Sequence, residues 1–137
     1  MYEPIRNKSV HAMAAETDMP HRSREEELDI RLAGHLTALL TVTDELRALG
    51  GSPALDDSAE RLAGTAARLR GGREPQRAAP SARDAGQDRL TALHQRAHTL
   101  AGMALVIATS REDEAAAELA AECLERHAEV LGPAGAA

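Results

Sequence analysis

The chain has 137 residues, a length that suits one domain. Its formal net charge of -6 argues against general binding of duplex nucleic acid, which requires clustered Lys and Arg. There is one Tyr and no Phe or Trp, so the core must be built from Leu, Val, Ile, Met and Ala. Leu and Ala favour helices over strands, and we therefore expect an all-α protein.

The cellular setting is indicated by one cysteine and by the hydropathy pattern. Cys123 has no partner for an internal disulfide, which is typical of the reducing cytoplasm. No run approaches the ~20 apolar residues of a membrane span, and the N-terminus lacks the order of a secretion signal. We expect a cytoplasmic protein without membrane contact. One Lys against fifteen Arg is typical of a GC-rich genome, such as an actinobacterial one.

The first segment, residues 1–22, shows no sustained period and mixes charge, Pro and small residues. This composition predicts a flexible, disordered arm. The alternative is that Tyr2, Ile5 and Val10 fold back onto the rest of the protein.

The first helix is predicted over residues 24–49. Ser23 and Glu26 have the spacing of a capping box, and Gly50 ends the pattern. Between them, one helical face is lined by Leu28, Leu32, His35, Leu39, Val42, Leu46 and Leu49. Alternating spacings of three and four residues are the signature of an amphipathic helix.

The second helix is predicted over residues 53–70, with Ser52 as its cap and Pro53 at its first position. The short connection predicts that it packs antiparallel to the first helix. Residues 71–83 hold two Gly, two Pro and three Arg and form a linker. The linker is long enough to cross the end of a bundle.

The third and fourth helices are predicted over residues 84–108 and 111–131. Thr109 with Glu112, and Ser110 with Asp113, offer two overlapping caps between them; a single kinked helix is the alternative. Gly132 and Pro133 end the last helix and leave a tail over 133–137. The expected fold is an antiparallel four-helix bundle of two helical hairpins, spanning residues 23–132.

The expected core is lean in bulky side chains. Its predicted members are His35, Leu39, Leu46, Leu62, Leu93, Leu100, Ile107, Cys123 and Leu124. His35 is expected to be buried and neutral, with His127 as its hydrogen-bond partner. Because a small core stabilises a monomer weakly, we expect a homodimer.

One short stretch carries a possible phosphotransfer site. "HTLAG", residues 98–102, resembles the active-histidine segment of histidine-containing phosphotransfer domains, matching it at His98, Leu100 and Gly102. The resemblance implies that the His98 imidazole accepts a phosphoryl group and that Gly102 leaves room for a partner. The family has a Lys where this chain has Ala101, which puts stabilisation of the phosphoryl charge in doubt.

A metal site is the other chemical hypothesis. His94 and His98 are four residues apart, so both rings lie on one helical face and could hold a transition metal. A site needs further ligands, and the fourth helix offers His127, Glu118, Glu122 and Glu125. The paired Glu-x-x-His motifs of di-iron bundles are missing from the sequence, and we expect no cofactor.

The leading hypothesis is a non-catalytic helical-bundle protein that acts through protein–protein contacts, for example as a bacterial regulatory or adaptor protein. The acidic faces of the first and fourth helices could attract a basic protein partner if they adjoin. The alternatives are a degenerate phosphotransfer module using His98 and a metal-binding bundle using His94 and His98.

Overall fold

The computed structural model describes residues 22–81 and 84–136. This part of the chain forms four helices and no strand: α2 (Arg24–Gly50), α3 (Pro53–Leu69), α4 (Gln87–Ser110) and α5 (Glu114–Ala136). The expected all-α class is confirmed. The predicted arm, with the alternative contacts of Tyr2, Ile5 and Val10, lies outside the described residues except for Arg22.

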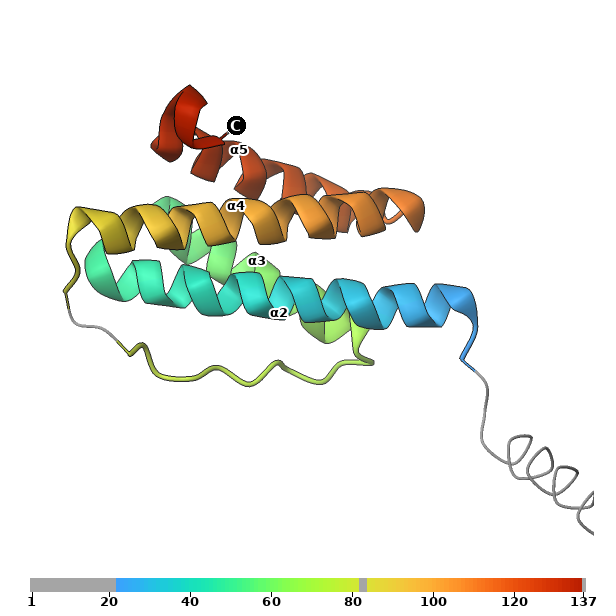
Figure 1. The fold of residues 1–137 in the computed structure, drawn as a ribbon. Coiled ribbons are helices and arrows are strands. Elements are labelled where there is room, and N and C mark those ends of the chain that lie inside the picture. The colour runs from blue at the N-terminus through green and yellow to red at the C-terminus, as the bar shows by residue number, and fades with distance from the viewer. Residues whose placement is uncertain (1–21, 82–83, 137) are drawn as a thin grey trace, which may run out of the picture.

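The helices form two antiparallel hairpins, α2 with α3 and α4 with α5, as Figure 1 shows. The hairpins pack on each other mainly through α2 and α4, while α3 and α5 meet over a short stretch. α2 and α5 are not neighbouring helices in the bundle. A four-helix bundle of two hairpins is therefore the correct description of this part of the chain.

Both helices of the first hairpin begin where the sequence predicts. The Ser23 hydroxyl accepts a hydrogen bond from the Glu26 amide at 3.1 Å, and Glu26 Oε1 accepts one from the Ser23 amide at 2.8 Å. The Ser52 hydroxyl accepts from the Leu55 amide at 3.3 Å, with Pro53 at the first helical position. These bonds satisfy amides that have no partner inside the helix.

The second hairpin begins and turns differently from the prediction. α4 starts at Gln87, three residues later than expected, after Gly86. α4 and α5 are separate helices, but neither predicted cap forms. Instead, Asp113 Oδ1 accepts from the Ala116 amide at 3.1 Å and caps α5, because a positive φ of 56° at Glu112 reverses the chain there.

α5 is interrupted at Gly132, where the sequence predicts that the helix ends. Its φ of 77° leaves the helical region, which suits a residue without a side chain. Helical turns resume after the break and reach Ala136, so the predicted tail over 133–137 is partly helical.

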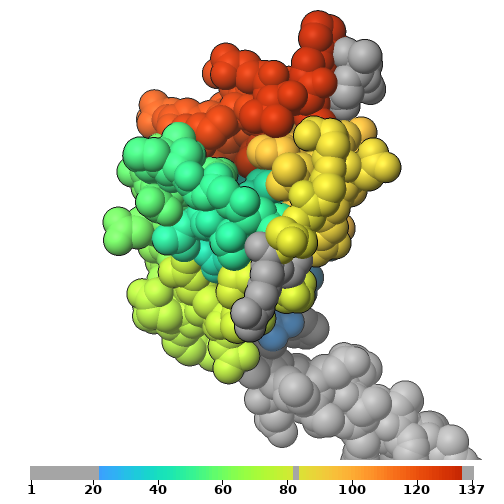
Figure 2. Space-filling model, turned by 90° about the vertical axis from the view of Figure 1, so that its left-hand side faces the viewer, coloured from blue at the N-terminus to red at the C-terminus, as the bar shows by residue number. Residues whose placement is uncertain are grey.

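The linker does not cross the end of the bundle, and that expectation is wrong. α3 ends at the opposite end from the start of α4, so the chain must return along the outside of α2 (Figures 1 and 2). Arg77 Nη2 lies 2.8 Å from Asp44 Oδ1, and the Ser81 amide donates to Glu45 Oε2 at 2.8 Å. Pro75 is buried. Polar contacts with α2 thus hold the linker.

The core lies between the hairpins and consists mainly of Leu and Ala. Among the expected members, the buried residues are Leu39, Leu46, Leu62, Leu93, Leu100, Ile107 and Cys123. Leu124 is half-buried against this core. His35 is also only half-buried, so its placement in the core is corrected. Across residues 22–81 and 84–136, no helix combines the length and hydropathy needed to cross a bilayer.

Candidate functional site

Two histidines meet between α4 and α5. His94 Nδ1 lies 2.9 Å from His127 Nδ1, and the ring centroids are 5.1 Å apart. One Nδ1 must carry a hydrogen and donate it in a hydrogen bond, and the other Nδ1 must accept that bond. The two rings therefore hold complementary tautomers. The expected pairing of His127 with His35 is wrong, because His127 pairs with His94 and α5 is not a neighbour of α2 in the bundle.

Burial keeps this pair neutral. The His127 side chain is 2% exposed, and burial is the main reason that its pKa falls to about 4. Electrostatic repulsion by His94, Arg126 and His98 adds smaller contributions to the same lowering. Burial also lowers the pKa of His94, which is half-buried. A neutral pair at this interface packs well but offers no ready acid near pH 7.

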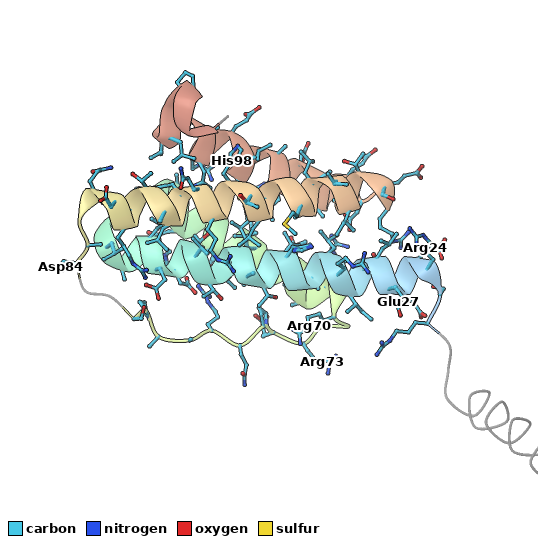
Figure 3. All side chains as sticks on the ribbon, in the orientation of Figure 1. Arg24, Glu27, Arg70, Arg73, Asp84 and His98 are labelled. Atoms are coloured by element: carbon cyan, nitrogen blue, oxygen red, sulfur yellow. The ribbon has the colours of Figure 1, made fainter. Side chains whose placement is uncertain are left out.

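His98 lies one helical turn beyond His94 on the side of α4 that faces α5 (Figure 3). It is half-buried, and a Cβ placed on Gly102 would meet Leu124 Cδ1 of α5 at 3.7 Å. Ala101, which occupies the position of the phosphotransfer family's Lys, is fully buried. This face of α4 therefore packs against α5, and the cation that the resemblance requires has no counterpart at Ala101.

The predicted metal ligands do not assemble. Within the described ranges, no group of three or more His, Cys, Asp or Glu is placed to hold a metal ion. His94 pairs with His127 through hydrogen-bonding nitrogens, and Glu122 Oε1 lies 2.7 Å from Arg61 Nη1. Glu118 and Glu125 are exposed on α5. The set His94, His98 and His127 is a packing cluster in this structure.

Cys123 belongs to a small polar cluster between α3 and α5. The thiol is buried, and burial raises its pKa against smaller opposing effects of Ser58 and Arg126. Arg126 donates a hydrogen bond to the hydroxyl of Ser58, which is also buried. A protonated, enclosed thiol is a poor nucleophile, so this cysteine contributes packing.

The acidic faces of α2 and α5 do not adjoin. The expectation that they form one binding site for a basic partner is therefore wrong. α2 and α5 do not lie side by side. On α2, three of the carboxylates bind partners within the fold: Asp29 pairs with Arg111, Asp44 with Arg77, and Glu45 with Ser81. On α5, the carboxylates exposed to solvent are Glu114, Glu118, Glu125 and Glu129. These four carboxylates form a row along α5, whereas the exposed acids of α2 are confined to its first turn, at Glu25, Glu26 and Glu27.

The outer face of α4 carries the residues that sequence reasoning missed. Met103 is 43% exposed and Val106 is 69% exposed, one helical turn apart. Residues 97–110 contain no Asp, Glu, Lys or Arg. An uncharged stretch of this length in an amphipathic helix was the available signal, but the strong Leu90–Ile107 periodicity accounted for the helix without it. We call Thr99, Met103, Val106 and Ser110, all exposed, the α4 face.

Comparison with protein-family models, with curated proteins and with solved structures finds no match for this chain.

Proposed function

We propose that this chain is a non-catalytic helical-bundle protein that acts through protein–protein contacts, and that the α4 face joins two copies of it. The observation that carries the proposal is the exposure of Met103 and Val106 on a helix without formal charge over residues 97–110. Apolar side chains gathered on one face are stabilised when a partner removes them from water.

A second copy fits this face better than an unrelated partner of opposite charge. The whole chain carries a formal charge of -6, so two copies repel each other wherever their acidic faces meet. On the α4 face no charge has to be desolvated, and the same surface can meet itself about a two-fold axis. Burying Val106 and Met103 in both copies supplies the attraction.

The exposed acids of α5 stay free in such a dimer, because they belong to a different helix. They would steer basic proteins toward the pair and give it the character of an adaptor or regulator. A cytoplasmic location, suggested by the single cysteine, belongs to the same proposal.

The test is the mass of the protein in solution. Light scattering after size exclusion should give a dimer for the natural chain. Val106→Glu places two carboxylates in the interface and should raise the dimer dissociation constant at least about tenfold, giving a monomer at the same concentration. Glu is a better helix former than Val, so the helical circular dichroism should be unchanged.

The matched control is Val130→Glu, which adds the same charge at a position on α5 that is 59% exposed. This variant should remain a dimer. A natural chain that is monomeric at high protein concentration, or a Val106→Glu variant that dimerises as well as Val130→Glu, would contradict the proposal.

A further inference from the structure

A groove of about 590 Å³ lies between the first half of α2 and the end of α3. Ile30 and Leu69 give it apolar walls, and Ile30 is 51% exposed. The groove belongs to a different pair of helices from the α4 face and from the histidine pair. It therefore needs its own explanation.

Three arginines surround this groove: Arg22, Arg70 and Arg73. Arg70 and Arg73 lie just past the end of α3, beside the first half of α2 (Figure 3). Arg73 Nε donates to the Arg70 carbonyl at 3.3 Å, which holds its side chain across the helix end. Cations at a helix C-terminus complement the helix dipole, and this is their minimal role.

These arginines differ from most of the others in the fold. Arg47, Arg61, Arg68, Arg77 and Arg111 each lie within 3.3 Å of a carboxylate oxygen. Within the described residues, Arg22, Arg70 and Arg73 form no ion pair. Three uncompensated cations around one groove attract carboxylates.

The wall formed by α2 lets a second chain come close. Nothing lies within 4 Å of the Cβ that a side chain at Gly34 would add, so the α2 backbone is open to the groove. Thr37, one turn further along, has a buried hydroxyl without a hydrogen-bond partner in the described chain.

We propose that this groove binds an acidic segment of a partner protein, with one apolar side chain over Gly34 between Ile30 and Leu69 and with carboxylates on the three arginines. The match is one of charge and of apolar contact. The apolar walls supply the anchor site, and the arginines supply bidentate partners for carboxylates.

A nucleic acid fits the same groove less well. Glu27 lies on the same side of α2, one turn before Ile30, and would repel a phosphate backbone that extends past the groove (Figure 3). The walls offer no aromatic ring for stacking bases. A short acidic peptide ends within the groove and does not extend past Glu27, and it needs no aromatic ring.

The test uses a short fluorescein-labelled synthetic peptide in which glutamates surround one leucine. Anisotropy with the full chain should show saturable binding. Replacing the glutamates by glutamine, or the leucine by serine, should weaken binding at least about tenfold. A single-stranded oligonucleotide of similar length should bind no better than the glutamine peptide.

Two variants assign the binding to the groove. Arg70→Glu combined with Arg73→Glu should abolish saturable binding of the peptide. Gly34→Leu should do the same without changing any charge, because the leucine fills the open wall. Leucine is a better helix former than glycine, so this variant should be folded as well as the natural chain.

Each variant has a matched control outside the groove. Arg31→Glu with Arg96→Glu changes the net charge equally at two exposed positions. Gly64→Leu adds the same side chain to an open position on α3. Both controls should bind like the natural chain. Equal binding by the groove variants and their controls, absence of saturable binding, or tighter binding of the oligonucleotide would overturn the proposal.

Discussion

At the scale of single residues, His127 makes the stability of the fold depend on pH. Its pKa of about 4 lies below the value of about 6.5 for an exposed histidine. Between these two values the unfolded chain binds more protons than the folded one. The contribution of His127 to the free energy of unfolding is therefore fully present above about pH 6.5. It is lost as the pH falls toward 4, and the loss amounts to about 3 kcal/mol.

The prediction is checked by urea unfolding at a series of pH values. His127→Leu keeps an apolar side chain in the buried position and removes the titrating group, so its free energy of unfolding should fall less steeply between pH 6.5 and 4. Subtracting the two curves removes the contribution of the carboxylates, which both proteins share. Parallel curves over this range would show that His127 does not carry the effect.

At the scale of elements, Asp44 is one of two carboxylates of α2 that hold the linker, the other being Glu45, which binds Ser81. Asp44 Oδ1 lies 2.8 Å from Arg77 Nη2 and 3.0 Å from Arg47 Nη1. Burial alone would raise the pKa of Asp44, but the hydrogen bonds from Arg77 and Arg47 outweigh it and lower that pKa. The attachment is therefore present at neutral pH and is lost as Asp44 is protonated in acid.

Asp44→Asn should release the linker without unfolding the helices. Both arginines lose a charged partner, and the expected cost is about 1–2 kcal/mol because the site is only partly screened by solvent. Trypsin should then cut after Arg77 faster than in the natural chain. Asp57→Asn, which affects the more exposed pair with Arg61, is the control and should leave cleavage at the linker unchanged. Equal cleavage rates in the two variants would contradict this role of Asp44.

At the scale of the whole molecule, the helices could be predicted from the sequence because their signals are local. Ser23, Ser52 and Gly132 act on neighbouring amides or on their own backbone, and apolar spacing marks the buried face of each helix. Which helices touch is a property of the packed bundle. That His127 meets His94, and not His35, depends on α5 lying against α4 and away from α2. Spacing along one chain does not contain that information.

The path of the linker and the α4 face were missed for the same reason. The linker follows α2 because the end of α3 and the start of α4 lie at opposite ends of the bundle, which no segment reveals alone. In the sequence, Val106 cannot be distinguished from the buried apolar residues of the same helix until the neighbours of α4 are known. Once α2 and α5 are seen to cover the other faces of α4, the exposure of Val106 becomes the feature that needs explaining.

Association and stability should then be linked in the whole molecule. A core of Leu and Ala without aromatic rings buries little area per residue, and a dimer formed through the α4 face adds to it. For such a dimer, a tenfold rise in protein concentration should raise the melting temperature by about 2–4 °C. Calorimetry over a hundredfold range of concentration measures this slope for the natural chain and for Val106→Glu. The slope should vanish in Val106→Glu and persist in Val130→Glu. A melting temperature of the natural chain that does not change with protein concentration would show that dimerisation does not stabilise the fold.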